Sequence, residues 1–201
     1  MTRISSIEGR ILYNSRGSKT IEIDVKSEGK FLGRVCAPSG ASVGKYEVVS
    51  FPNGKPEESL RILQENSQKF IGLESSDLKG IHDTLKSLDN STNYSRIGSA
   101  LAFAVTIAAM ESAAKAAEQP LFEILSPKSS FKFPFPLGNI LGGGAHAGPG
   151  TPDIQEILIC ATGSKTIEEA IETNLSVHKE LRRVLEKEDP NFTNGRGSRI
   201  V

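Results

Sequence analysis

Net charge is the first thing this sequence lacks. Lys and Arg together number 24 and so do Asp and Glu, which gives the 201-residue chain a formal charge of +0. No basic run interleaved with aromatic side chains is present either, so nothing is suited to the backbone of a nucleic acid or to an anionic lipid surface. With 37% hydrophobic and 24% charged residues, the composition argues against nucleic-acid binding and is typical of a soluble globular protein.

Cysteines and long apolar runs are also scarce. Cys36 and Cys160 lie far apart, each flanked by apolar residues, so we expect two buried free thiols and not a disulfide or a metal site. The N-terminal MTRISSIEGR has no apolar core of the kind found in signal peptides, and residues 97–109 are too few and too rich in Ser and Ala for a membrane span. We therefore expect a cytoplasmic protein without a membrane span.

The familiar catalytic signatures are missing as well. The sequence contains no HExxH, no paired CxxC, no P-loop and no nucleophile elbow. These four motifs therefore do not indicate the function, and the predicted strands and helices provide the context for the remaining candidate residues.

The pattern of apolar residues predicts strands first. Residues 20–27, TIEIDVKS, alternate so that Ile21, Ile23 and Val25 share one face. An earlier strand begins near Ile4, and FLGRVCA at 31–37 returns after a turn. These segments predict a three-stranded antiparallel meander.

Helical patterns follow the strands. They cover residues 56–71, 75–89 and 95–125, and Ser75 or Ser76 is the expected N-cap of the second helix. The third pattern is half small residues, which indicates a helix buried on most sides with its neighbours packed close to its backbone.

A second structural part is expected after the helices. Residues 126–136, SPKSSFKFPFP, are rich in Pro, Ser and Lys, as linkers are. Strand-like segments follow at 136–143 and 153–161, and a helix is predicted from about residue 165 to 188. The residues alone therefore predict a two-part α/β chain.

The segment PSGASVGKYE, residues 38–47, is the first candidate for chemistry. Its small residues allow the backbone to approach a ligand or to move as a lid. Ser42 offers oxygen, which a hard cation such as Mg²⁺ prefers. A plain surface loop is the alternative, and composition does not decide between the two.

A second candidate is GGGAHAGPGTPDIQE, residues 142–156. His146 lies among small residues, where its ring could contact an anion or a carboxylate, although a lone histidine more often serves structure. Gln155 and Glu156 follow on the expected strand and would point to opposite faces.

Four segments in one order give the sequence a family resemblance. They read ILYNSRGSKTIEIDV, PSGASVGKYE, IGSALAFAVTIAAMESAAKAAEQPLFEIL and GNILGGGAHAGPGTPDIQEILI. Together they resemble the N-terminal portion of enolase, the phosphopyruvate hydratase, in its archaeal form. The resemblance implies an α+β fold: residues 1–133 form a three-stranded meander with helices, and residues 134–201 form the first ββα part of an incomplete (β/α)8 barrel.

The resemblance also implies an activity and a set of site residues. The family interconverts 2-phosphoglycerate and phosphoenolpyruvate in glycolysis and gluconeogenesis with two Mg²⁺ ions per complete site, as a homodimer or a higher oligomer. Ser42 matches the metal-binding serine, His146 and Gln155 match substrate contacts, and Glu156 matches a catalytic residue that faces the substrate and the departing water. The family's mobile loop falls on Ser39, Gly40, Ala41, Ser42, Val43 and Gly44.

Other positions match or depart from the family pattern. Arg16 and Glu22 match positions often involved in subunit contact, and we interpret both as structural. Val43 stands where the family usually has Thr, so one loop hydroxyl is missing. The first turn departs at Asn14, Ser18 and Lys19, and the histidine loop departs at Gly142 and Ala145.

The end of the sequence bears on activity. In the family the lysine base, three carboxylate ligands of Mg²⁺ and a phosphate-binding arginine lie beyond the position of residue 201, and Ser198 and Arg199 replace an expected Asp and Glu. We therefore expect this chain alone to have no enolase activity. One interpretation of this departure from the family is a truncation or a frame shift. Two others are that the chain is a non-catalytic interaction module, or that it is half of a split enolase that needs a separate barrel chain.

Overall fold

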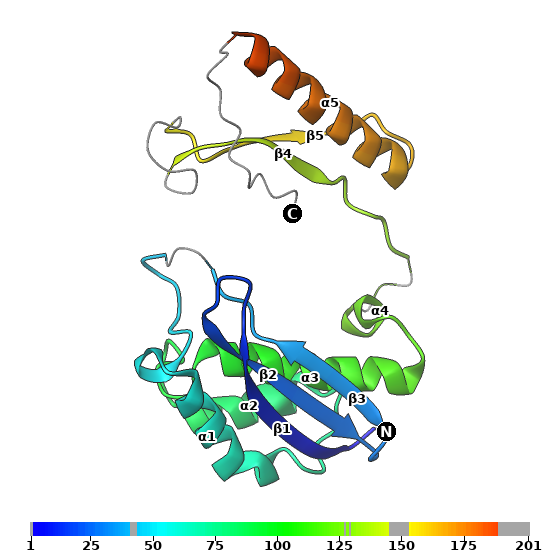
Figure 1. The fold of residues 1–201 in the computed structure, drawn as a ribbon. Coiled ribbons are helices and arrows are strands. Elements are labelled where there is room, and N and C mark those ends of the chain that lie inside the picture. Colours follow the sequence, from blue (N-terminus) through cyan, green and yellow to red (C-terminus); the bar gives the residue numbers. More distant parts are fainter. Residues whose placement is uncertain (1, 41–43, 127, 129, 145–152, 189–201) are drawn as a thin grey trace. The chain divides into compact units, whose positions relative to one another are not determined.

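A computed structural model describes residues 2–40, 44–126, 128, 130–144 and 153–188 (Figure 1). The chain divides into two compact units, residues 1–129 and residues 130–201.

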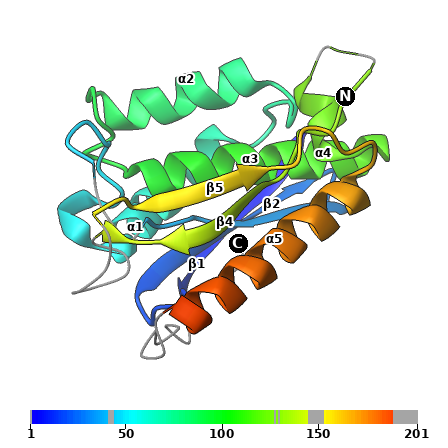
Figure 2. The same cartoon turned by 90° about the horizontal axis from the view of Figure 1, so that it is seen from above.

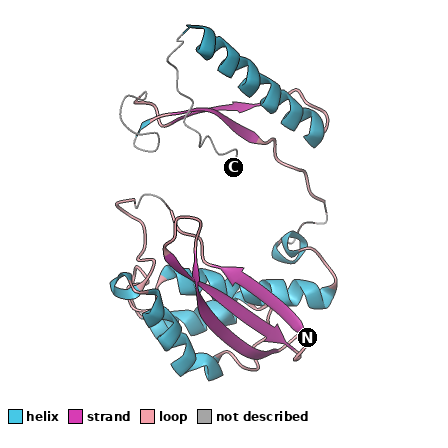
Figure 3. Cartoon of the chain, in the orientation of Figure 1, coloured by secondary structure: helices cyan, strands magenta, loops and turns pink. Residues whose placement is uncertain are grey.

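The first unit is built on a three-stranded antiparallel sheet in the order β1-β2-β3, which confirms the expected meander (Figure 3). Alternation along the central strand buries Ile21, Ile23 and Val25 completely, because all three point to the same face of the sheet. The strands are β1 (Ile4–Tyr13), β2 (Lys19–Ser27) and β3 (Phe31–Cys36).

Helices cover the apolar face of this sheet (Figure 1). Helix α3 contacts β2 and β3, α1 contacts β1, and α2 packs against α3 (Figure 2). The helices of this unit are α1 (Pro56–Asn66), α2 (Leu78–Asp89), α3 (Ser99–Ala117) and the short α4 (Leu121–Leu125), with 3-10 turns at Pro52–Gly54 and Ser67–Lys69.

The expected cap of α2 was wrong. The N-cap is Asp77, whose side chain accepts a hydrogen bond from the amide of Gly80 at 3.0 Å. Ser75 is buried and its hydroxyl donates to the carbonyl of Thr2 at 2.8 Å. The helix begins at Leu78, directly after Asp77, so neither Ser75 nor Ser76 stands at the capping position.

Helix α3 lies unusually close to β3. A Cβ on Gly33 would lie 1.8 Å from the carbonyl oxygen of Ala108, so only glycine fits there. The hydroxyl of Ser112, one turn further on, donates to the carbonyl of Phe31 at 2.8 Å and shares a hydrogen bond with the hydroxyl of Ser27 at 2.7 Å. Small residues on the helix thus let the two backbones approach, as the sequence predicted.

By length and composition α3 would qualify as a membrane span, and it is the one helix in the described residues that does. In this structure 56% of its most apolar window is buried. The apolar character of the helix is therefore accounted for by its position in the core, between the sheet and α2.

The opposite face of the sheet is charged. Glu22 and Asp24 of β2 point to it and pair with Arg10 of β1 and Arg34 of β3. Cys36 lies on the same face and is exposed, so the expectation that it is buried was wrong. The apolar neighbours of Cys36 in sequence point to the core, and strand alternation turns the thiol outward.

The second unit has two antiparallel strands and one helix, namely β4 (Leu137–Gly142), β5 (Glu156–Cys160) and α5 (Ile167–Glu188). Helix α5 packs on both strands, and the amide of Asn174 donates to the carbonyl of Pro136 at 3.0 Å. The described residues form no closed barrel. Cys160 ends β5 in an exposed position, which again differs from the buried thiol expected.

Candidate functional site

The turn between β1 and β2 is the base of the first candidate segment. The side-chain oxygen of Asn14 accepts hydrogen bonds from the amides of Arg16 and Ser18, at 2.9 and 3.0 Å. Gly17 adopts a φ of +74°, a region that favours glycine, and its amide donates to the carbonyl of Asn14 at 2.9 Å. The turn is therefore closed by both the side chain and the backbone of one residue.

This turn holds the chain that leaves β3. In a meander, the turn after the first strand and the end of the third strand lie at the same end of the sheet. Nη2 of Arg16 donates to the carbonyls of Ser39 and Gly40, each at 2.9 Å, and to the hydroxyl of Ser39 at 3.0 Å. Nδ2 of the Asn14 side chain donates to the same hydroxyl at 3.0 Å. A shallow hollow of about 300 Å³ lies here, with Tyr13 and Cys36 also on its wall.

The far end of the segment forms a turn of its own. The carboxylate of Glu47 accepts from the amide of Gly44 at 2.9 Å, and the amide of Glu47 donates to the carbonyl of Gly44 at 3.1 Å. The ammonium of Lys45 lies 5.5 Å from the ring centre of Tyr46. Of the predicted loop, Ser39, Gly40 and Gly44 are described, whereas Ala41, Ser42 and Val43 lie outside the described residues.

The second candidate segment belongs to the other unit. Glu156 is the first residue of β5 and pairs with Gly142 of β4, while Gln155 lies just before the strand. The carbonyl of Gln155 accepts from the amide of Gly143 at 2.8 Å. Both side chains are exposed. His146 lies outside the described residues, so the structure does not relate it to either one.

The described residues alone do not supply a metal site. Over the parts of the chain that the structure describes, no three His, Cys, Asp or Glu side chains are grouped so that they could hold a metal ion. Mg²⁺ takes about six oxygen ligands, usually including carboxylates. The expected metal residue, Ser42, would contribute one ligand to a set that these residues do not complete.

Arg16 is the residue that sequence reasoning undervalued. Its position matches one of subunit contact and was interpreted as structural; in this structure its side chain also contacts the candidate loop. The predicted meander already implied this contact, because it places the turn after the first strand beside the residues that follow the third strand.

Comparison with known proteins identifies the family of both units. Residues 4–125 match the family model "Enolase, N-terminal domain", and residues 130–197 match "Enolase, C-terminal TIM barrel domain". The chain is 40% identical to the enolases of Methanosphaera stadtmanae and Methanothermobacter thermautotrophicus over 195 residues, and 32% identical to that of Pyrobaculum aerophilum over 200 residues. These alignments cover 96% of this chain and 47–48% of the relatives, so the chain spans about half their length. With one family matched in order along nearly all of its length, this chain belongs to the enolase family.

Proposed function

We propose that this chain supplies the N-terminal half of an enolase site, which interconverts 2-phosphoglycerate and phosphoenolpyruvate with Mg²⁺. The observation that carries the proposal is the consecutive match of residues 4–125 and 130–197 to the two enolase domains. We assign the N-terminal domain to residues 1–133 and the start of the barrel to residues 134–201, in a cytoplasmic protein that forms homodimers or higher oligomers.

The proposed roles follow the family resemblance. Ser42 gives oxygen to one of two Mg²⁺ ions, and the loop from Ser39 to Gly44 closes over the substrate. His146 and Gln155 contact the substrate, and Glu156 faces the substrate and the departing water. The exposure of Gln155 and Glu156 at the start of β5 supports this assignment, because a residue that meets substrate must be accessible from outside its own strand pair.

The reaction needs groups that the described residues do not provide together. Removal of a proton beside a carboxylate requires a positioned base with a matched pKa, and a complete (β/α)8 barrel takes about 250 residues. The second unit offers two strands and one helix of such a barrel. We therefore propose that the 201-residue polypeptide is inactive by itself and becomes active with a barrel segment.

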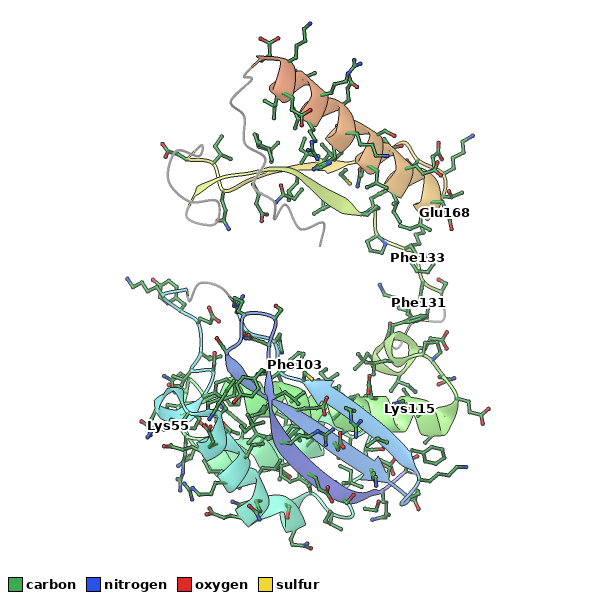
Figure 4. The ribbon with its side chains drawn as sticks, viewed as in Figure 1. Lys55, Phe103, Lys115, Phe131, Phe133 and Glu168 are labelled. Carbon is green, nitrogen blue, oxygen red and sulfur yellow. The ribbon has the colours of Figure 1, made fainter. Side chains whose placement is uncertain are left out.

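The test is complementation. The 201-residue polypeptide is assayed for conversion of 2-phosphoglycerate to phosphoenolpyruvate with Mg²⁺, alone and mixed with the unmatched C-terminal part of the Methanosphaera stadtmanae enolase. We expect turnover only in the mixture, and loss of most of it in E156Q and S42A. The matched control is E168Q, since Glu168 lies in the first turn of α5 (Figure 4) and is not among the proposed site residues. Turnover by the polypeptide alone, or a stable complex without turnover, would contradict the proposal.

A non-catalytic interaction module is the second candidate function. Apolar side chains of the second unit are exposed, among them Leu137 at 63%, Ile154 at 62% and Phe133 at 87%. Phe133 is labelled in Figure 4. Exposed apolar surface of this kind favours association. Formation of a complex with the barrel segment whose affinity is unchanged in E156Q and S42A, with no turnover, is the result this alternative predicts.

A further inference from the structure

Arg16 reaches across from one loop to another. Its acceptors are two backbone carbonyls and one hydroxyl, all contributed by Ser39 and Gly40. Among the described residues Arg16 forms no ion pair. Its guanidinium bonds to these three oxygens through Nη2. A charged donor makes shorter and stronger hydrogen bonds than a neutral one does.

We infer that Arg16 is a positioning residue that fixes the backbone path at Ser39 and Gly40, where the chain enters the candidate loop. Its importance for catalysis rests on the function proposed above. The contact itself does not, because it lies wholly within the described part of the first unit.

The base from which Arg16 acts is itself fixed. The ladder between β1 and β2 continues to the pair Tyr13 and Lys19, directly before and after the turn. Asn14 then closes the turn through its side-chain oxygen. Arg16 therefore projects from a constrained backbone and can transmit that constraint to its acceptors.

The acceptors need an external restraint. Ser39 and Gly40 follow the last residue of β3 by three and four positions and belong to no helix or strand. Glycine has wide conformational freedom, so the direction of the chain at Gly40 is not set by its own φ preferences. Bonds to two successive carbonyls restrict the two peptide units that decide this direction.

The hydroxyl of Ser39 adds a second connection. It accepts from Nη2 of Arg16 and from Nδ2 of Asn14, each at 3.0 Å. Asn14 and Arg16, both in the turn after β1, thus hold the same hydroxyl of Ser39. Asn14 stands where the resemblance leads one to expect Asp, and its amide gives this turn a donor that a carboxylate lacks.

The test measures local order in the 201-residue polypeptide by ¹⁵N relaxation. In R16M, which keeps the apolar stem but no donor, the order parameters of Ser39 and Gly40 should fall from about 0.85 toward about 0.6. Ala37, whose amide bonds to the carbonyl of Ile21 at 2.9 Å, should not change. R16K should restore part of the order, since all three acceptors lie around one nitrogen, and the lysine ammonium brings three N–H donors to that region. R61A, which removes an exposed guanidinium paired with Glu65, is the matched control.

Two relaxation results would overturn the role of Arg16. Order parameters in R16M equal to those of the parent chain would overturn the inference, as would a loss that R16K does not reduce. If R16M fails to fold, R16Q decides: it keeps a polar side chain but is too short to reach the carbonyls of Ser39 and Gly40, and unchanged order at these two residues would then overturn the inference. In a complementing mixture that turns over 2-phosphoglycerate, R16M should lower kcat about tenfold, with partial recovery in R16K. Absence of turnover in the parent mixture would defeat the proposed function and leave the relaxation result to decide this one.

Discussion

Arg34 binds the carboxylate of Asp24 in two places: Nε donates to Oδ1 and Nη2 donates to Oδ2, each at 2.7 Å. Arg10 reaches the same carboxylate from the opposite neighbouring strand, at 3.1 and 3.3 Å. The central strand thus carries an anion held from both sides, on the face of the sheet away from α3. Bidentate pairs of this kind are the stronger class of ion pair.

The first prediction concerns acid stability. The hydrogen bonds from Arg34, together with Arg10 and against the effect of burial, lower the pKa of Asp24 to about 2. A lowered pKa stabilises the folded state above the unfolded pKa of about 3.9, and this stabilisation is lost as the pH falls toward 2. D24N should remove up to about 2 kcal/mol of this pH-dependent stability. Urea unfolding between pH 2 and 7 measures it.

A matched variant on the helix surface checks that prediction. Asp83 also has a lowered pKa through Lys79, but both side chains are more than half exposed. Solvent screens such a pair, so D83N should change acid stability far less than D24N. Equal slopes of unfolding free energy against pH in the two variants would contradict the role of the sheet network.

The second prediction concerns the close approach of α3 to the sheet. In G33A the new methyl group would lie 1.8 Å from the carbonyl of Ala108, so helix and strand must separate. Overpacking of this kind costs roughly 1–3 kcal/mol, and more where both neighbours are backbone. G44A is the control, since its nearest neighbours, both on Glu47, lie at 3.9 Å or beyond. Thermal unfolding should show a large fall in Tm for G33A only.

The third prediction concerns a buried carboxylate. Asp89 is 2% exposed and accepts hydrogen bonds from the amides of Ser91, Arg96 and Ile97 and from the hydroxyl of Ser91. Burial would raise the pKa of Asp89, but these bonds together lower it. D89N replaces one acceptor oxygen with a donor and should destabilise the first unit by about 2–3 kcal/mol.

Denaturant titration of D89N gives that number. Helices α2 and α3 should lose order together, because Asp89 connects the end of α2 to the approach to α3. A change below about 0.5 kcal/mol, as for an ordinary surface substitution, would show that these hydrogen bonds are readily replaced by water.

The fourth prediction concerns thiol reactivity. Partial desolvation and the hydrogen bond from Sγ to Glu22, 3.2 Å long, raise the pKa of Cys36 although the residue is exposed. Because the thiolate is the nucleophile, Cys36 should react with iodoacetamide more slowly than an ordinary thiol at pH 8. E22Q should lower the pKa and speed the reaction.

The other cysteine is the internal reference for that experiment. Cys160 lies at the end of β5 in the second unit, whereas Glu22 belongs to the first unit. Its labelling rate should be the same in the parent chain and in E22Q. Mass spectrometry of the two alkylated peptides reports both rates in one sample.

The fold followed from the sequence where a periodic pattern determines the structure. Alternation in residues 20–27 fixed which side chains of β2 are buried, because one face of the sheet must be covered. The broad run of small apolar residues in 95–117 likewise indicated a helix packed tightly on several sides, and α3 is such a helix.

Features set by a single contact were not predictable in this way. The cap of α2 is Asp77, because the helix begins at Leu78, while Ser75 is engaged with Thr2, more than seventy residues away in sequence. The cysteines were misjudged because their apolar neighbours in sequence say little about which face a strand residue occupies. At the candidate site, residue types suggested the loop, whereas the contact of Arg16 required the strand order.

Helix α3 is made long after the strands it covers. Strand β3 ends at Cys36 and α3 ends at Ala117, so roughly eighty more residues must be made before the main cover of the sheet is complete. At a synthesis rate of about 5–20 residues per second, the apolar face of the finished meander waits for roughly 4–16 s before it can be buried. During that interval the α3-facing side of the nascent sheet, with Ile21, Ile23 and Val25, is open to other apolar surfaces.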